Sequence, residues 1–244
     1  MKKIITSALL ASALFSAPAL AADIPAKGPV FKAPPAVFNW TGWYGGINAG
    51  YAWDPNYVFE NPPGTPDLIL PLNLQGGFGG LQIGYNRQIS AIWLIGVEAD
   101  FQFADIKDRF NFTYPGGGAS FAALTITHFG TVRARFAYVM DRSLIYFTAG
   151  GAFAQFKANV FADFDVDDGI INGRQWLAGY VVGAGFERAF ANNWSLKFEY
   201  LFIDFAHLDI RGINTGGGQV ALTGDPYMHL VRLGLNMRFA TGTP

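Results

Sequence analysis

Large apolar residues occupy every second position over eight stretches of this chain, with polar or small residues between them. The last stretch shows the pattern most clearly: Val231, Leu233, Leu235, Met237 and Phe239 are apolar, and the positions between them include Arg232 and Arg238. A β-strand projects successive side chains to opposite faces, so each stretch predicts a strand with one apolar and one polar face. The eight stretches comprise residues 43–53, 78–87, 92–103, 124–138, 144–157, 175–190, 194–205 and 229–239.

The alternation also predicts the face on which each side chain lies. In the fourth stretch, one apolar face is expected to carry Leu124, Ile126, Val132, Ala134, Phe136 and Tyr138. The fifth stretch, residues 144–157, is so rich in Gly and Ala that its facing stays undetermined.

The links between the stretches differ in length in a regular way. Short links follow the second, fourth and sixth stretches, at residues 88–91, 140–143 and 191–193. Long links follow the odd-numbered stretches, at residues 54–77, 104–123, 158–174 and 206–226. Tight turns at the periplasmic end and long loops at the outer end are typical of outer-membrane barrels. An even number of strands then predicts that both termini are periplasmic.

Composition separates this prediction from a soluble sheet. The chain is 51% hydrophobic and 16% aromatic and contains 30 glycines, yet its hydrophobicity alternates instead of forming long apolar runs. A closed barrel is the sheet structure that satisfies its backbone hydrogen bonds inside lipid. We therefore expect an all-β fold: an eight-stranded antiparallel transmembrane β-barrel of the cell outer membrane, with short periplasmic turns and four long extracellular loops.

The first residues predict export. Lys2 and Lys3 precede an uncharged apolar run and an Ala19-Leu20-Ala21 cleavage site, which together indicate a secretory signal peptide over residues 1–21. A Pro- and Lys-rich periplasmic tail is expected over residues 22–39, the barrel over 40–239 and a short extension over 240–244. The mature net charge of 15 − 18 = −3 gives no general affinity for nucleic acid, and the absence of cysteine excludes a disulfide framework.

Nine charged residues share the polar faces of the predicted strands. They are Glu98, Asp100, Arg133, Arg135, Glu187, Lys197, Glu199, Arg232 and Arg238. An eight-stranded barrel has an interior just wide enough for side chains to fill it, so these charges are expected to interlock as a buried network. The alternative is a small-solute porin with a narrow charged lumen.

Aromatic residues gather near both ends of the predicted strands. Rings with a polar edge favour the lipid headgroup region, so two aromatic girdles are expected. Their members are Trp43, Trp53, Trp93, Phe103, Tyr138, Trp176, Trp194 and Tyr227.

Several motifs resemble one family. Asn39-Trp40-Thr41-Gly42-Trp43-Tyr44 and Phe198-Glu199-Tyr200 are similar to the small outer-membrane β-barrel proteins of rhizobia and Brucella, and the resemblance covers the mature chain. Arg232, Gly234, Met237 and Phe239 look like the C-terminal signal by which the barrel-assembly machinery recognises such proteins, although five residues follow Phe239 here. The resemblance implies abundant surface antigens that stabilise the envelope, with pore activity or hemin binding claimed for some.

Catalytic and metal-binding motifs are weak. His128, His207 and His229 lack metal-ligand spacing, and the Asp163-to-Gly169 segment fails as a calcium loop because position six is Asp168 and position twelve is Arg174. Asp204 and His207 lack the second pair that a membrane protease needs. We expect no enzyme activity, cofactor or metal. The expected partners are outer-membrane lipid, lipopolysaccharide and the assembly machinery. A hemin- or host-ligand-binding receptor is a further alternative, with His207 and Tyr227 as candidates.

Overall fold

A computed structural model describes residues 38–54, 72–113, 118–163, 169–191, 193–214 and 219–239 of the chain. These residues form ten strands. They are β1 (Gly42–Trp53), β2 (Gln75–Gln88), β3 (Trp93–Thr113), β4 (Ala119–Met140), β5 (Ser143–Ala162), β6 (Gly169–Ala189), β7 (Trp194–Phe205), β8 (Leu208–Asn214), β9 (Gln219–Gly224) and β10 (Tyr227–Arg238). Within the described ranges, no helix is long and apolar enough to cross a membrane.

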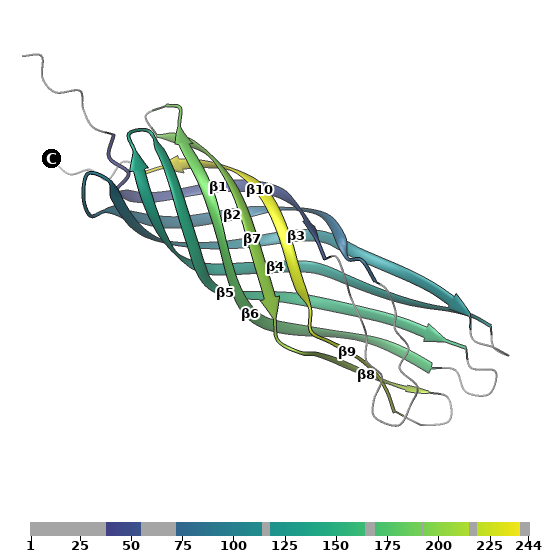
Figure 1. Cartoon of the computed structure of the whole chain (residues 1–244). Coiled ribbons are helices and arrows are strands. Elements are labelled where there is room, and N and C mark those ends of the chain that lie inside the picture. Colours follow the sequence, from purple (N-terminus) through teal and green to yellow (C-terminus); the bar gives the residue numbers. More distant parts are fainter. Residues whose placement is uncertain are drawn as a thin grey trace, which may run out of the picture. The chain divides into compact units, whose positions relative to one another are not determined.

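Eight strands close into a barrel (Figure 1). Each strand from β1 to β7 pairs antiparallel with the next, β7 pairs with β10, and β10 returns to β1 over the register Tyr44–Arg238 to Trp53–His229. The predicted eight-stranded antiparallel barrel is therefore confirmed. Closure removes sheet edges, so each strand is paired on both sides over the part of its length that forms the ring.

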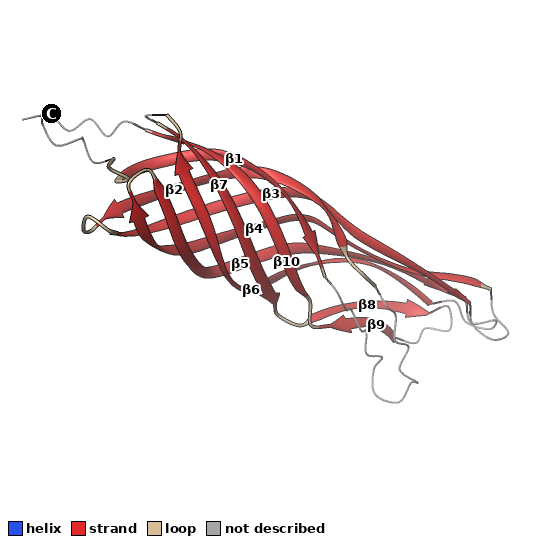
Figure 2. Cartoon of the chain, turned by 45° about the horizontal axis from the view of Figure 1, so that its top comes forward, coloured by secondary structure: helices blue, strands red, loops and turns tan. Residues whose placement is uncertain are grey.

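Four strands are much longer than the sequence pattern suggested. β3 to β6 contain 20 to 22 residues, whereas β1, β7 and β10 contain 12. The predicted loops 104–123 and 158–174 are consequently mostly strand, and the predicted loop 206–226 contains the β8–β9 hairpin, which pairs with β6. We call residues 104–113, 119–127, 154–162 and 169–175, with β8 and β9, the outer extension (Figure 2). The opposite end carries short links and is called the short-turn end.

The outward face of β3 changes character where the outer extension begins. From Ile95 to Phe103 its outward positions are apolar, and from Asp105 to Asn111 they are polar or charged. A transmembrane β-strand needs about 9–11 residues, so β3 exceeds a membrane by roughly ten residues. The apolar outward positions of the ring, from the level of Trp93 to that of Phe103, are called the apolar band.

One facing prediction for β4 is wrong. Leu124 and Ile126 are buried inside, whereas Val132 on the same strand is 60% exposed on the outward face. The pairing of β4 shifts register between Ile126 and His128 on the β5 side, and a second irregularity lies on the β3 side. An extra residue in a strand reverses its alternation of inward and outward side chains. Leu124 and Ile126 therefore point into the interior instead of to the expected outer face.

Two apolar clusters fill the two ends of the interior. The apolar plug lies toward the outer extension and includes Leu72, Leu74, Phe78, Ile106, Leu124, Ile126, Phe129, Phe156, Leu201, Phe205, Leu208, Leu222, Met228 and Leu230. The apolar cap lies at the short-turn end and comprises Trp40, Leu94, Ala137, Val139, Leu144, Tyr146 and Ala189, with Phe38 against it. The fifth strand, left open by its sequence, thus turns Tyr146 and Phe156 inward.

Candidate functional site

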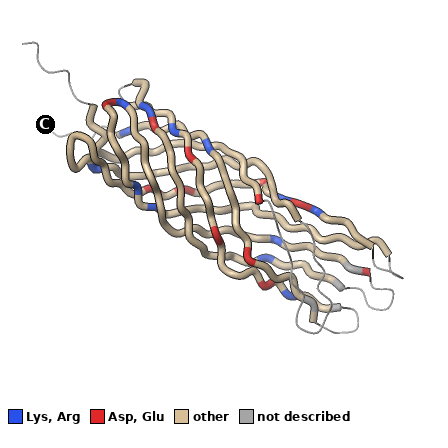
Figure 3. Tube along the Cα trace, in the orientation of Figure 1, with Lys and Arg blue, Asp and Glu red and all other residues tan. Residues whose placement is uncertain are grey.

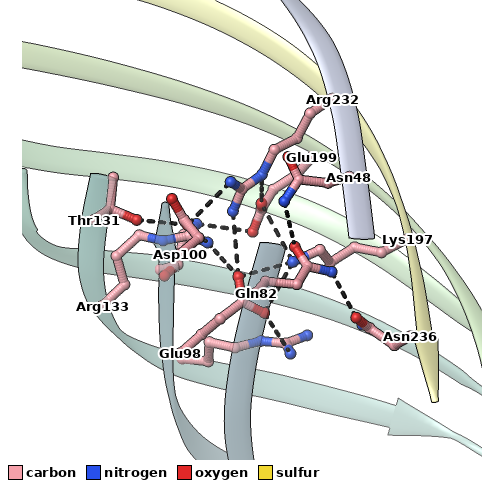
Figure 4. Close-up of polar contacts among 12 residues, drawn as sticks. Asn48, Gln82, Glu98, Asp100, Thr131, Arg133, Lys197, Glu199, Arg232 and Asn236 are labelled. Carbon is pink, nitrogen blue, oxygen red and sulfur yellow. Dashed lines mark hydrogen bonds and ion pairs between the residues drawn. The ribbon is translucent and has the colours of Figure 1, made fainter. Parts of the chain in front are cut away.

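A cluster of buried charges lies between the apolar cap and the apolar plug. The interior contacts bring together eight of the nine charged residues predicted from the sequence, and Figure 4 labels all of these except Arg135 and Glu187. They are Glu98, Asp100, Arg133, Arg135, Glu187, Lys197, Glu199 and Arg232. Four acids face four bases, so the cluster has no formal net charge.

Neighbouring strands set up the first ion pairs. Glu98 on β3 lies directly opposite Arg133 on β4, and their side chains form an ion pair. Glu199 on β7 lies opposite Arg232 on β10, with 2.6 Å between Arg232 Nε and Glu199 Oε2. Alternation therefore places each pair on the inward face and the strand register brings the partners together.

Other contacts cross the interior and join walls that are not neighbours. Arg133 Nη1 on β4 donates to Glu199 Oε1 on β7 at 2.9 Å, and Lys197 Nζ donates to both oxygens of Glu98 at 2.8 and 2.9 Å. Arg232 Nη1 reaches Asp100 Oδ2 at 3.0 Å. Charge-assisted bonds of this kind are the strongest hydrogen bonds in proteins. The cluster therefore spans the barrel from wall to wall.

Two tyrosines belong to the same cluster, and the sequence analysis missed them. The Tyr44 hydroxyl donates to Glu98 Oε2 at 2.7 Å, the Tyr146 hydroxyl donates to Glu199 Oε1 at 3.0 Å, and Arg135 lies 4.0 Å above the Tyr146 ring. Each ring covers a glycine on the next strand: a Cβ at Gly84 or Gly185 would stand 2.4 Å from it. The inward parity of Tyr44, next to outward Trp43, is the signal that reveals the first tyrosine.

Neutral polar side chains continue the cluster toward β1 and β10. Asn48 Nδ2 donates to Gln82 Oε1 at 3.1 Å, Gln82 Nε2 donates to Asn236 Oδ1 at 2.5 Å, and Asn236 Nδ2 donates to Glu187 Oε1 at 2.9 Å. Ser195 also donates to Glu187, at 2.6 Å. A buried polar cluster of this size is stable only when most of its members have partners.

Arg238 lies apart from the eight clustered charges. Its guanidinium donates to the backbone oxygen of Asn39 at 2.5 Å and stands 4.0 Å above the Phe38 ring. Trp40 is fully buried beside them and donates from Nε1 to the Asp141 oxygen at 3.1 Å. The chain just before β1 therefore folds across the short-turn end, and Arg238 holds it there.

The predicted aromatic girdle residues lie at two levels of the outward face. Trp43, Trp93, Tyr138 and Trp194 lie near the short-turn end, where Trp93 is directly opposite Tyr138. At the other level, Trp53 stacks on His229, and Phe103 and Trp176 are 62% and 52% exposed. Tyr227 joins this level through contacts with Phe202 and His229.

The proposed C-terminal signal residues have different surroundings. Arg232 is buried in the charge cluster, and Gly234 faces inward, where Gln82 occupies the space that a Cβ would need. Met237 and Phe239 are exposed on the outward face. Residues 1–37 and 240–244 lie outside the described residues, and with them the predicted signal peptide and extension.

The candidate ligand residues form no common site. His207 contacts Asp225 at 2.8 Å, while Asp204 accepts from the Tyr180 hydroxyl at 2.8 Å. Asp165, Asp167 and Asp168 of the failed calcium loop lie outside the described residues. In the described ranges, no three His, Cys, Asp or Glu side chains are grouped as metal ligands.

The observed cavities differ sharply between the inside and the outside of the barrel. An interior cavity beside Asp54, Phe156 and Met228 has a volume of about 10 Å³, close to what one water molecule needs. A groove of about 660 Å³ opens on the outward face, over small residues such as Gly96, Ala134 and Ala149. The groove lies within the apolar band, and its lining includes Arg135, whose side chain belongs to the charge cluster.

Comparison with known proteins places the chain. Residues 7–239 match the family described as "Outer membrane protein beta-barrel domain". The 31 kDa outer-membrane immunogenic protein of Brucella melitensis is 33% identical over 254 residues, which cover 98% of this chain and all of that protein. The 22 kDa outer membrane protein of Rhizobium leguminosarum bv. viciae is 32% identical over 136 residues, 54% of this chain and 55% of that protein. The crystal structure of OprG from Pseudomonas aeruginosa aligns with 82% of this chain and 98% of its own, at 11% identity and a TM-score of 0.46. The resemblance to the rhizobial and Brucella proteins is thus confirmed, and the chain belongs to the outer membrane protein β-barrel family and resides in the outer membrane.

Proposed function

We propose that this protein is a plugged barrel that stabilises the cell envelope and presents its outer extension to the surroundings, without catalysing a reaction. The short-turn end faces the periplasm and the outer extension faces outward. This orientation follows from the usual arrangement of short and long links in outer-membrane barrels.

The observation that carries the proposal is the layered interior. The charge cluster joins opposite walls through Arg133, Glu199 and Lys197, and it lies between the apolar cap and the apolar plug. A solute crossing the barrel would have to break paired charges, each of which is costly to leave alone in a buried position. It would also have to pass an apolar layer on either side.

The surface role is supported by the outer extension. Its strand β3 rises past the apolar band with polar outward positions, such as Lys107 and Asn111. The Brucella relatives are named immunogenic, which describes proteins that an immune system meets. By analogy, we infer that the outer extension is the part of this chain accessible from outside the cell.

Bilayer recording tests the plugged barrel. The mature protein, refolded and shown by protease protection to be inserted, is expected to leave a planar bilayer silent. Arg133→Gln, which removes one charge from the interior, is recorded in the same way. Discrete, reproducible current steps from the unmodified protein that change in size in Arg133→Gln would replace the proposal with the small-solute porin.

A further inference from the structure

Two like charges stand directly opposite each other on the outward face of the outer extension. Lys157 on β5 pairs in register with Arg174 on β6. They end a row that runs from Lys107 on β3 through Thr125 on β4, each position opposite the next. Like charges that face each other across strands destabilise a sheet, so this pair calls for a compensating anion.

No carboxylate in the described ranges pairs with Lys157 or Arg174. The acids around the row have other partners: Asp105 pairs with Lys107 at 2.9 Å, and Asp209 on β8 with Arg211 at 2.8 Å. The hydrogen bond from Arg211 lowers the pKa of Asp209. The excess positive charge of Lys157 and Arg174 is therefore left for a ligand.

The level of the pair identifies the kind of ligand. Phe153 and Trp176, whose rings lie 6.1 Å apart, are outward residues at the edge of the apolar band. Lys157 and Arg174 follow them toward the outer extension, where Lys and Arg positions lie on adjacent strands (Figure 3). A charged side chain just beyond an aromatic girdle lies among lipid headgroups. In the outer leaflet of a Gram-negative outer membrane, those headgroups are the phosphorylated sugars of lipopolysaccharide.

We propose that Lys157 and Arg174 bind a phosphate group of lipopolysaccharide in the outer leaflet. Adjacent strands are about 4.8 Å apart, so one phosphate can accept hydrogen bonds from both side chains. The guanidinium of Arg174 offers a bidentate contact and the ammonium of Lys157 a point charge. This inference rests on the orientation assumed in the proposed function.

Native mass spectrometry of the mature protein in detergent tests the site, with diphosphoryl lipid A as the probe. The double variant Lys157→Gln/Arg174→Gln is expected to bind it about tenfold more weakly, because charge-assisted contacts are lost. Arg188→Gln is the matched control, since Arg188 is also exposed and outward but lies at the short-turn end. The control is expected to bind like the unmodified protein.

A stability measurement separates lost binding from lost folding. Without lipid A, the double variant is expected to melt no lower than the unmodified protein, because the opposed charges are gone. With lipid A, only the unmodified protein and Arg188→Gln gain stability. Equal affinity of the double variant and the unmodified protein overturns the site, as does an equal loss in Arg188→Gln. Neither result depends on bilayer conductance, so the phosphate site and the plugged barrel are tested independently.

Discussion

The apolar band and the outer extension are built from the same strands, yet they bury opposite kinds of side chain. Within the band, β3 turns Val97 and Phe101 outward and Glu98 and Asp100 inward. Farther along the same strand, Lys107 is outward and Ile106 is inward. One strand thus has an inverted interior in one region and an ordinary hydrophobic interior in the next.

The solvent outside the barrel explains this difference. In lipid, moving an apolar side chain inward gains no hydrophobic free energy, so apolar side chains face out and polar side chains line the small lumen. In water, burial of apolar surface is again favourable, at about 25 cal/mol per Å². The charge cluster therefore fills the lumen where the outer wall of the barrel must be apolar. The apolar plug stabilises the parts of the strands that extend beyond the membrane.

The largest expected effect comes from breaking the charge cluster at its centre. Glu98→Gln removes a carboxylate that Arg133, Lys197 and Arg232 share and leaves one excess positive charge inside the barrel. We expect it to lower the free energy of unfolding by about 3–5 kcal/mol, measured by urea titration in lipid vesicles.

A double variant sharpens this result. Glu98→Gln/Lys197→Met restores the charge balance, so it is expected to lose less stability than the sum of the two single variants. A strictly additive loss would mean that the two side chains do not share one cluster, contrary to the 2.8 Å contact between them.

The second effect tests the apolar plug. Leu124→Ala opens a cavity in the outer extension and is expected to cost about 2–5 kcal/mol, measured in the same titration. Val132→Ala, on the outward face of the same strand, is the control and is expected to cost much less, because lipid fills the space. Equal costs would return Leu124 to the outward face that the alternation of the sequence predicted.

Leu124 also shows where inference from this sequence ends. Strict alternation identified the strands of the apolar band and placed Glu98, Arg133 and Glu199 on one inward face, because the pattern has a single meaning while the outside is lipid. Beyond the band the meaning of the pattern reverses, and the register shift in β4 breaks its phase. Alternation alone predicts neither the reversal nor the register shift. The outer end of each long strand was therefore expected to be loop, over about half of β3 and a smaller part of β4, β5 and β6.

The contacts within the cluster required the three-dimensional ring. Glu98 and Arg133 could be paired from neighbouring strands, whereas the contact between Arg133 and Glu199 joins β4 to β7 across the lumen. No spacing in the sequence encodes the stagger of a closed barrel. Arg238 has the same inward parity as Arg232, but it is the last residue of β10. There its guanidinium contacts Phe38 and Asn39 instead of the charge cluster.

The smallest expected effect compares one substitution on either side of the boundary. Val97→Arg places a charge on the outward face within the apolar band, where it is expected to cost about 2–4 kcal/mol near the bilayer midplane. Thr113→Arg places the same side chain at the outward end of β3, beyond the lipid, and is expected to cost about 0–1 kcal/mol. Both costs are measured by urea titration in vesicles. If the boundary between the apolar band and the outer extension lies between the two residues, Val97→Arg stays the more costly variant in vesicles with longer acyl chains. A cost at Thr113 that equals the cost at Val97 would place the outer extension inside the membrane, and the inverted interior would then need another cause.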